Sequence, residues 1–324
     1  MELESAPEAL LSGRYIGQQV DRQETRGIKG ITPHGWEAVS AMLKFATIKR
    51  LGRKPRLAKT AEEVEARLRQ MRNWTRGPFN KAISWFVQVG VAVLSVFYLK
   101  VFNKARVHHR DRLLNTERPY MYVSNHLTMF DDFFIDSLIF LPYAFTDIRN
   151  FPWHAPEEKN FFLGPIIGYL MQKAQCIPLT RGHGVFQPGM TRLKELLQGE
   201  SIVHIYPEGT RSRSGDIGKG QVGVGRLAYQ AKAKVLPVYH EGTQELLPIG
   251  SHRLKFGKRV EVIVGDPIDM SDLYALDDSR EVYQKIADRM IDTLRALRTE
   301  LHDTGHGIFP IPENQVETEE EEGQ

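Results

Sequence analysis

The pattern of apolar and polar positions divides the chain near residue 107. Before that point, one long uncharged stretch stands among polar and basic residues. After it, short β-rich runs alternate with stretches of helical periodicity, which predicts an α/β fold with a central mixed sheet flanked by helices. We expect strands at 119–125, 176–179, 202–208, 235–240 and 259–268. We expect helices at 131–141, 160–174, 186–199, 224–233 and 280–301.

The uncharged stretch covers residues 82–99, with the sequence AISWFVQVGVAVLSVFYL. A spanning helix needs about 20 mostly apolar residues, and here two serines, a glutamine and a glycine dilute the stretch. Lysines and arginines flank both ends, so the positive-inside rule selects no orientation. Three interpretations stay open: a half-embedded or interfacial helix, which the composition favours, a spanning helix, and a buried core helix. The protein would accordingly be peripheral, monotopic or single-pass.

The net charge of +3 hides an uneven distribution. Residues 1–110 contain 20 Lys and Arg against 9 Asp and Glu, and residues 44–59 contain seven basic residues and no acid. Such a region suits an anionic surface, either a membrane or a nucleic acid. Residues 60–74 have a helical composition, with Thr60 as the expected N-cap. The tail from Glu313 to Gln324 contains six glutamates and no basic residue, which is typical of a disordered, solubilising end.

These changes of composition divide the chain into four parts. Residues 1–75 form a basic extension that we expect to be partly helical and partly disordered, and residues 76–106 an apolar helix that associates with a membrane. Residues 107–304 form the α/β domain, and residues 305–324 the acidic tail. The only cysteine, Cys176, excludes an intramolecular disulfide and a cysteine-based zinc site. We therefore expect a membrane-associated protein whose site faces the cytosol or a reducing, matrix-like compartment.

His126 and Asp131 stand in SNHLTMFDD, at the junction of a predicted strand and a predicted helix. In one continuous helix, a spacing of five residues separates two side chains by about 140° around the axis. The pair can meet only if His126 lies in the turn after the strand and Asp131 begins the helix, with Asn125 positioning the turn. An acid that holds a histidine fixes its tautomer and makes it a general base. The alternative is an acid favoured at a helix N-terminus, next to an unrelated histidine.

A second polar stretch, YPEGTRSRSG, follows a predicted buried strand. Gly209 turns the chain there, and Arg211 carries a planar guanidinium that can bind two phosphate oxygens at once. Glu208 would hold Arg211 or bond a substrate hydroxyl, because open α/β sheets bind ligands at the carboxyl ends of their strands. Arg181, just beyond another predicted strand, is a candidate second phosphate contact. The alternative for these arginines is a solvated basic surface.

We expect no bound cofactor and no metal. Gly218, Gly220 and Gly223 spell a dinucleotide fingerprint, but a charged loop precedes them where that fingerprint requires a strand. His204 has no ligand partner at a suitable spacing, and we expect it to be packed or hydrogen-bonded within its strand.

Taken together and in this order, these stretches resemble the conserved blocks of the glycerolipid acyltransferase family. NHLTMFD is similar to its N-H-x4-D block, YPEGTRSRSG to its P-E-G-T-R block, TRG to its middle block and VLPVYHEG to its last. The doubled Asp131-Asp132, together with CIPLTRGHGVFQPGM and VHIYPEG, resembles the tafazzin branch. Tafazzin-like chains usually carry Gly-Lys after P-E, whereas the Gly-Thr-Arg found here is typical of lysophosphatidate acyltransferases. The resemblance covers about residues 107–270.

The resemblance implies a glycerol-3-phosphate acyltransferase-like single domain that works as an O-acyltransferase at a membrane. His126 would remove the proton from the hydroxyl of a lysophospholipid such as lysophosphatidate, and Asp131 would orient His126. The residues that would hold the phosphate and glycerol of this acceptor are Asn125, Arg181, Glu208, Gly209, Thr210 and Arg211.

The resemblance also implies the partners. The acyl donor would be acyl-CoA or acyl carrier protein, acting as a co-substrate, and membrane lipids would be the other partners, with no nucleic acid. A tafazzin-like transacylase that takes the acyl group from a phospholipid is the alternative. A non-catalytic lipid-binding membrane protein on the same fold is a further one. The headgroup and chain preference, the membrane and the oligomeric state stay open.

Overall fold

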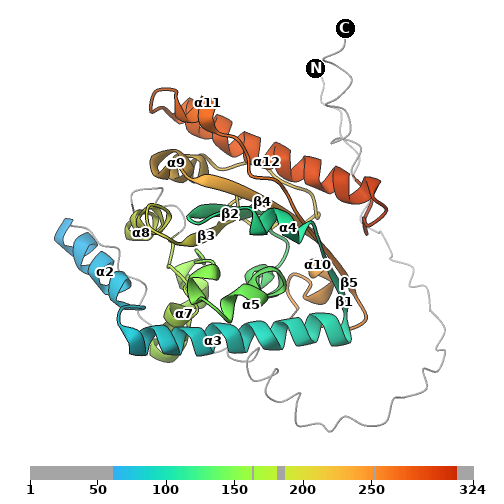
Figure 1. Ribbon diagram of the computed structural model, residues 1–324, viewed down its shortest axis with the longest axis horizontal. Helices are drawn as coiled ribbons and strands as arrows, with labels where there is room; N and C mark the ends of the chain where they lie inside the picture. The colour runs from blue at the N-terminus through green and yellow to red at the C-terminus, as the bar shows by residue number, and fades with distance from the viewer. Residues whose placement is uncertain (1–60, 163, 181–186, 252, 312–324) are drawn as a thin grey trace, which may run out of the picture.

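The structure, a computed structural model, describes residues 61–162, 164–180, 187–251 and 253–311. Within them, the predicted α/β architecture is confirmed: a five-stranded mixed sheet lies between two layers of helices (Figure 1). The basic stretch at 44–59, Thr60, Arg181 and residues 312–324 of the acidic tail lie outside the described residues.

The sheet has two halves that run in opposite directions. Its strands are β1 (Lys104–His108), β2 (Tyr120–Ser124), β3 (Ile202–Ile205), β4 (Lys234–Glu241) and β5 (Arg259–Val264). Their order in space is β1-β5-β4-β2-β3. β2 pairs in parallel with β3 and β4, and β1 in parallel with β5, whereas β4 and β5 are antiparallel. The carboxyl ends of β2, β3 and β4 therefore meet at one edge, which is where open α/β sheets bind their ligands.

Helices cover both faces of the sheet. α3, α5 and α7 lie on one face, and α9 and α12 on the other (Figure 1). The helices are α2 (Ala61–Asn73), α3 (Pro78–Phe97), α4 (Arg110–Leu114), α5 (Ser137–Ala144), α6 (Glu158–Phe161), α7 (Pro165–Lys173), α8 (Pro188–Leu197), α9 (Val222–Ala231), α10 (Thr243–Leu246), α11 (Ser271–Tyr274) and α12 (Arg280–Asp303). Three shorter turns are π-helical or 3-10 helical: η1 (Tyr98–Phe102), η2 (Asp132–Asp136) and η3 (Ile148–Asn150).

The interior strand β2 is buried on both faces, and its side chains alternate between two hydrophobic clusters. Tyr120 and Tyr122 belong to the cluster that contains residues of α3 and α5. Met121 and Val123 belong to the cluster that contains residues of α8, α9 and α12. This is the two-residue period of a strand between two helical layers. It fixes the register of β2, so the position of the residues that follow it is fixed as well.

The predicted helix at 160–174 is wrong as a single element. The structure has α6 and α7 there, and Gly164 between them adopts a φ of 95°. Only glycine adopts this conformation without strain, and Pro165 directly after it begins α7, the position at which proline is favoured.

The predicted strand at 176–179 is also wrong. Cys176 and Leu179 make only isolated bridges, with His154 and Glu157 respectively. Pro178 between them has no N–H to donate, so a regular ladder cannot run through it.

The edge strand β1 has no counterpart among the predicted strands. Lys104 and Arg106 on it are exposed, whereas Ala105 between them is buried. Charged residues on an edge strand prevent pairing with other chains, and they also remove the apolar signal by which a strand is recognised in a sequence.

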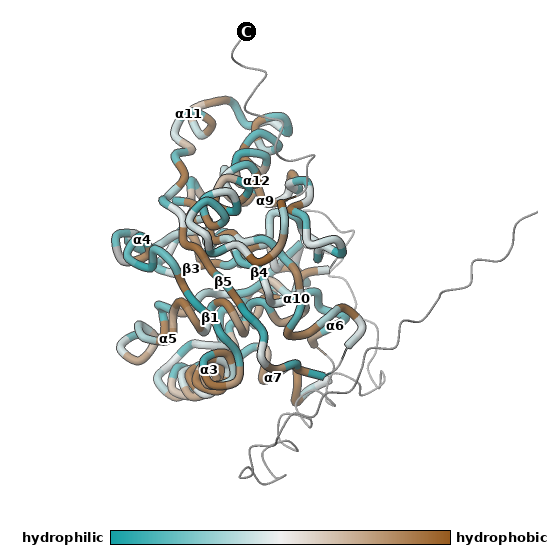
Figure 2. The backbone as a smooth tube through the Cα atoms, turned by 90° about the vertical axis from the view of Figure 1, so that its right-hand side faces the viewer, coloured by the Kyte–Doolittle hydropathy of each residue, from teal (hydrophilic) through white to brown (hydrophobic). Residues whose placement is uncertain are grey.

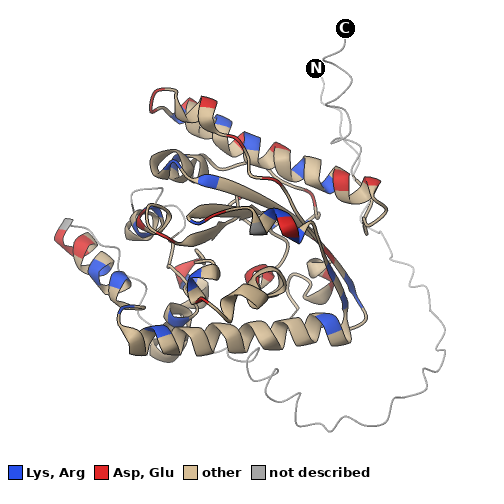
Figure 3. Ribbon diagram, viewed as in Figure 1, with Lys and Arg blue, Asp and Glu red and all other residues tan. Residues whose placement is uncertain are grey.

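The apolar stretch forms α3 and continues through η1. Its polar residues Ser84 and Gln88 are buried, and Gln88 bonds Gln175 in the domain. Its exposed residues are apolar, and charges occur only near its ends (Figures 2 and 3). Among the described residues, Pro78–Phe102 is the one helix long and apolar enough to cross a membrane. Of its 18 most apolar consecutive residues, 28% are buried. The buried-core interpretation of this stretch is therefore wrong.

Candidate active site

His126 lies in the turn that leaves β2, and Asp131 begins the helical segment that continues into η2. The Nδ1 atom of His126 lies 3.0 Å from Oδ2 of Asp131. The imidazole is partly accessible, with 16% of the side chain exposed, whereas Asp131 is fully buried. The chain thus folds back between these residues, as the spacing of five requires, and brings the two groups together.

The carboxylate of Asp131 is surrounded by hydrogen-bond donors. Its Oδ2 atom accepts from the backbone N–H groups of Leu127 at 2.6 Å and Thr128 at 2.8 Å. Its Oδ1 atom accepts from the Thr128 hydroxyl at 2.9 Å. Burial alone would raise the pKa of Asp131, but His240, His126 and these donors outweigh burial and hold the pKa below its ordinary value.

An ionised Asp131 fixes the tautomer of His126. A carboxylate can only accept hydrogen bonds, so Nδ1 of His126 must carry the proton that it donates to Asp131. In the neutral ring this leaves Nε2 with a free lone pair. A buried acid on one nitrogen and a free lone pair on the other is the arrangement of a general base.

The ring of Tyr206 sets the plane of the His126 imidazole. The two rings are stacked, with centroids 3.7 Å apart and an angle of 13° between their planes. Tyr206 follows directly after β3, so the histidine is held between an acid that follows β2 and an aromatic ring that follows β3.

Glu208 ties the P-E-G-T-R stretch to the histidine turn. Its Oε1 accepts from the backbone N–H of His126 at 3.1 Å, and its Oε2 accepts from Gly218 N–H at 2.9 Å. The backbone N–H of Ser212 donates to the carbonyl of His126 at 2.7 Å. Burial raises the pKa of Glu208 in spite of the two N–H donors. With both oxygens engaged and 4% of the residue exposed, Glu208 holds the backbone of the site together.

Gly209, Thr210 and Arg211 form the accessible part of this stretch. Gly209 adopts a φ of 64°, and an added Cβ would lie 3.0 Å from the Gln221 side chain, so both conformation and space favour glycine. Thr210 is exposed and Arg211 is partly exposed. No partner in the described part of the chain neutralises the Arg211 guanidinium, which therefore remains available to an anion.

Asn125 is buried, and its side chain is engaged with β4. Its amide donates to the carbonyl of His240 at 2.8 Å, and its side-chain oxygen accepts from the His240 N–H at 2.9 Å. The Nε2 atom of His240 lies 2.9 Å from the Asn125 carbonyl and 4.0 Å from Oδ2 of Asp131. Asn125 thus joins the ends of β2 and β4 beneath the turn that carries His126. Arg181 lies outside the described residues, and only its neighbour Thr180 is placed, with its N–H 2.7 Å from the Gln187 side-chain oxygen.

Sequence reasoning missed Tyr206, Gly218 and His240 as parts of the site. Tyr206 stands directly before P-E-G, and His240 is the histidine of VLPVYHEG, so both belong to stretches that were recognised for other reasons. Gly218 could not be found, because its N–H acts as a donor only through the fold of the loop between β3 and α9.

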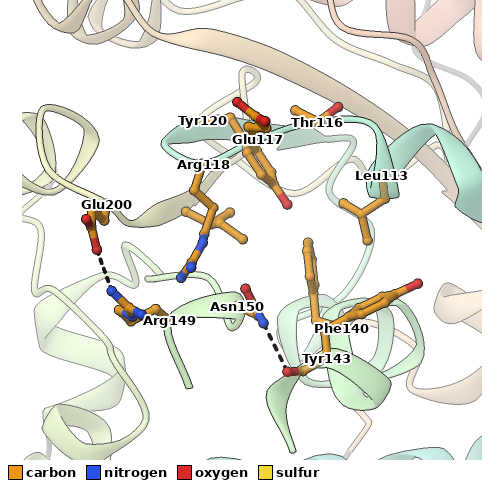
Figure 4. Close-up of a pocket in the computed structure, with 11 residues that line it drawn as sticks. Leu113, Thr116, Glu117, Arg118, Tyr120, Phe140, Tyr143, Arg149, Asn150 and Glu200 are labelled. Carbon is orange, nitrogen blue, oxygen red and sulfur yellow. Dashed lines mark hydrogen bonds and ion pairs between the residues drawn. The ribbon is translucent and has the colours of Figure 1, made fainter. Parts of the chain in front are cut away.

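A cavity of about 530 Å³ lies elsewhere (Figure 4). Tyr120 and Ile202, the first residues of β2 and β3, line it, so it opens at the opposite end of these strands from His126. The six residue-to-residue steps from Tyr120 to His126 extend up to roughly 20 Å. Arg149, which also lines the cavity, is paired with Asp147 and Glu200. This cavity is therefore separate from the histidine site.

The domain is characterised by two parallel strands, β2 and β3. A histidine held by a buried acid follows β2, and the P-E-G-T-R turn follows β3. Residues 104–241 match the family model described as Acyltransferase. The match begins at β1 and ends at the last residue of β4, so it contains both His126 and the P-E-G-T-R stretch.

This chain is similar to three known proteins. Tafazzin of Drosophila melanogaster is 29% identical over 232 residues, which cover 67% of this chain and 61% of tafazzin. The chloroplastic 1-acyl-sn-glycerol-3-phosphate acyltransferase of Arabidopsis thaliana is 29% identical over 214 residues, covering 66% of this chain and 56% of that protein. The chain thus spans about three fifths of the length of these relatives. The crystal structure of a 1-acyl-sn-glycerophosphate acyltransferase from Thermotoga maritima has a TM-score of 0.43 and 16% identity, covering 79% of this chain and 89% of that one.

Proposed function

We propose that this protein transfers a fatty acyl group to the hydroxyl of a lysophospholipid at a membrane surface. The observation that carries the proposal is the 3.0 Å contact between Nδ1 of His126 and the buried, donor-saturated carboxylate of Asp131. This contact leaves Nε2 of a partly exposed imidazole as a base at the ligand-binding edge of the sheet. The acyltransferase family of the domain supports the same reaction.

The reaction needs only groups of this chain and two substrates. Nε2 of His126 takes the proton of the acceptor hydroxyl while the hydroxyl oxygen attacks the carbonyl carbon of the acyl donor. The tetrahedral intermediate then collapses and the bond to the leaving group breaks. The imidazolium gives its proton to the departing thiolate of a thioester, or to the departing alkoxide of an ester. Asp131 stabilises the imidazolium between these two transfers.

Arg211 is the candidate contact to the phosphate of the acceptor. Its guanidinium has no acidic partner in the described part of the chain, and it lies two residues after Gly209, which turns the chain toward the histidine. A planar guanidinium binds phosphate through two parallel hydrogen bonds. The names of the relatives, 1-acyl-sn-glycerol-3-phosphate acyltransferases among them, support an acceptor that carries a phosphate. Arg181 is proposed as a second contact from the sequence alone.

The donor separates two forms of the proposal. Acyl-CoA or acyl carrier protein would supply a thioester, and a phospholipid would supply an ester in a transacylation. Tafazzin is as similar to this chain as the chloroplastic acyltransferase is, at 29% identity each. The P-E-G-T-R stretch of lysophosphatidate acyltransferases favours the thioester form.

The membrane contact would be formed by α3 and α7, which lie next to each other. α3 exposes Phe86 at 69% and Leu94 at 61%, and α7 exposes Ile166 at 71%. Because the opposite face of α3 packs on the domain through Gln88, the helix would lie in the interface together with the domain. This geometry supports the monotopic arrangement over the spanning one.

The experiment is a matrix of acceptors and donors with the purified full chain. Lysophosphatidate, monolysocardiolipin and other lysolipids are each offered with acyl-CoA, with acyl carrier protein thioester and with phospholipid alone. Turnover with a thioester supports the acyltransferase form, and turnover with phospholipid alone supports the transacylase form. A His126→Gln variant is the matched control, and activity that persists in it would contradict the proposed base. Absence of transfer in every combination would leave lipid binding without catalysis.

A further inference from the structure

A second group of histidines and aspartates lies behind the site described above. Asp132 and Asp136 are the first and last residues of η2, His204 lies on β3, and His154 lies in the segment that bridges to Cys176. Asp136 is fully buried, and His204 and His154 are 2% and 7% exposed. One atom each of Asp132, His154 and His204 lie within 4.8 Å of one another. Four groups that titrate or bind metals thus share one small interior volume.

Four distances between these groups are close to those of a metal coordination shell. Nδ1 of His204 lies 3.2 Å from Oδ2 of Asp136 and 3.9 Å from Oδ1 of Asp132. Nδ1 of His154 lies 3.4 Å from Oδ2 of Asp136 and 3.6 Å from Oδ2 of Asp132. Ligands bonded to a tetrahedral zinc ion at about 2.0–2.2 Å lie about 3.4 Å from one another. Of these four pairs, only Asp132 and His204, at 3.9 Å, would have to move closer together to bind one cation.

The Nδ1 atom of His204 faces the Asp136 carboxylate. When the other hydrogen bond of His204 takes the ring proton, Nδ1 presents a lone pair to that carboxylate. The Ser124 hydroxyl donates to the Asn125 carbonyl at 3.2 Å, so its oxygen is free to accept from Nε2 of His204, 2.8 Å away. A neutral His204 that donates from Nε2 has no proton on Nδ1. In this tautomer Nδ1 of His204 and the Asp136 carboxylate are both acceptors at 3.2 Å, and a cation between them would bind both; in the other tautomer, Nδ1–H donates to Asp136.

Two further atoms of this cluster lack a partner in the described part of the chain. Oδ1 of Asp136 and Nδ1 of His154 are buried without any hydrogen bond. Native proteins satisfy nearly all such atoms, and an unmet one commonly marks a missing water or ion. Nδ1 of His154 points at the same two carboxylates as Nδ1 of His204, so one ion would satisfy both histidines.

We propose that His154, His204, Asp132 and Asp136 bind a divalent transition-metal ion, for which two imidazoles and two carboxylates make zinc the best match. The Ser124 hydroxyl would serve as the outer partner that fixes the tautomer of His204, as outer-shell groups do for metal-bound histidines. The ring of His204 also lies 4.6 Å from that of Tyr206, which stacks on His126. The ion would therefore lie behind the histidine site without contacting a substrate.

The test measures metal binding directly and does not depend on acyl transfer. The full chain is stripped with a chelator, loaded with zinc chloride or cobalt chloride, dialysed and analysed for metal per chain. We expect one ion per chain in the native protein, together with the visible absorption of four-coordinate cobalt. We expect Asp132→Asn and His154→Asn to weaken zinc binding by about a hundredfold or more, because each removes a ligand. Asp147→Asn and His108→Asn are the controls, since these residues pair with Arg149 and Glu261 outside the cluster.

The variants also need a measurement that distinguishes a lost ligand from a damaged fold. In the metal-free proteins, Asp132→Asn should unfold at the same temperature as the native chain or higher, because it removes one of two neighbouring negative charges. Added zinc should raise the unfolding temperature of the native chain and of both controls, but not that of Asp132→Asn. Equal zinc binding by the native chain and the Asp132 and His154 variants would overturn the proposal. So would a native chain that holds no ion after loading with zinc chloride and dialysis, since a shared proton would then fill the gap.

Discussion

Asp131 and Asp132 are neighbours in the sequence, yet their carboxylates meet two different groups of histidines. Asp131 accepts hydrogen bonds from two backbone N–H groups and a hydroxyl and holds His126 at 3.0 Å. Asp132 lies 3.6 Å from His154 with no donor between them in the described structure. One carboxylate is surrounded by donors, whereas the other lies beside the Nδ1 atoms of two imidazoles. The surroundings of the carboxylate, rather than the residue type, therefore distinguish the proposed partner of the general base from the candidate metal ligand.

The histidines of the two groups differ in access in the same way. The His126 side chain is 16% exposed, whereas that of His204 is 1% exposed. Burial lowers the pKa of His204 to about 3, so this imidazole stays neutral at physiological pH. A base must reach a substrate, and a structural ligand must exclude solvent. Substitutions in the first group are therefore expected to lower activity, whereas substitutions in the second group are expected to lower metal binding.

The largest effect is expected for His126→Ala. Removal of the general base should lower kcat/KM for acyl transfer by about 10³–10⁴-fold, because no other group offers a free imidazole nitrogen at this position. Liposome binding and the unfolding temperature should stay as in the native protein. Assays with the lysolipid and donor that the native chain prefers would measure the loss. Turnover within tenfold of the native value would place the base elsewhere.

Asp131→Asn should have the next largest effect. The amide cannot hold the Nδ1–H tautomer of His126, and we expect kcat to fall about 10²–10³-fold. The change should also lower the free energy of unfolding by about 2 kcal/mol, because two backbone donors lose a charged acceptor. The pKa of Asp131 is lowered in the folded state, so this stability is present above the unfolded value of about 4 and is lost as the pH falls through the folded one. A stability difference from the native chain that grew in acid would contradict this assignment.

Arg211→Ala should act on binding more than on chemistry, since Arg211 contacts neither group of histidines. We expect KM for a phosphate-bearing lysolipid to rise about 10–100-fold, which corresponds to the loss of one charge-assisted contact, with kcat changed much less. Arg213→Ala, with an exposed side chain two residues further on, is the matched control. A fall in kcat alone, with KM unchanged, would show that Arg211 is not the phosphate contact.

The smallest effect on activity is expected for Asp132→Asn, which makes it the sharpest contrast with Asp131→Asn. We expect less than a roughly threefold change in kcat/KM, because Asp132 does not contact His126. The same variant should lose zinc binding. If Asp132→Asn reduced activity as much as Asp131→Asn does, the two carboxylates would form a single functional unit.

The sequence was sufficient for the pair His126 and Asp131 because their geometry is local. A strand end, a turn and a helix start lie within seven residues, and each has its own signal in the sequence. The P-E-G-T-R stretch could be placed beside them because both follow strands of a parallel pair. The sequence could not show that Glu208 and Asn125 are engaged with backbone groups of neighbouring segments.

The second group of histidines and aspartates could not be predicted in this way. Asp136 and His204 are 68 residues apart in the chain, and they meet only because η2 packs against β3. The same reason applies to α3: its apolar composition was evident, but not that Ser84 and Gln88 face the domain. Long-range contacts of this kind depend on the tertiary fold and leave no periodic signal in the sequence.

The pairing of β1 with β5 has a consequence for the timing of synthesis. Lys104 pairs with Arg259, so the first strand of the sheet to leave the ribosome must wait for the last. The intervening 155 residues take roughly 8–30 seconds to translate at about 5–20 residues per second. α3 is synthesised before β1, and even in the completed fold it exposes Phe86 and Leu94. The nascent chain can therefore reach a bilayer before its sheet is complete, and membrane attachment can precede folding of the domain that carries the histidine site.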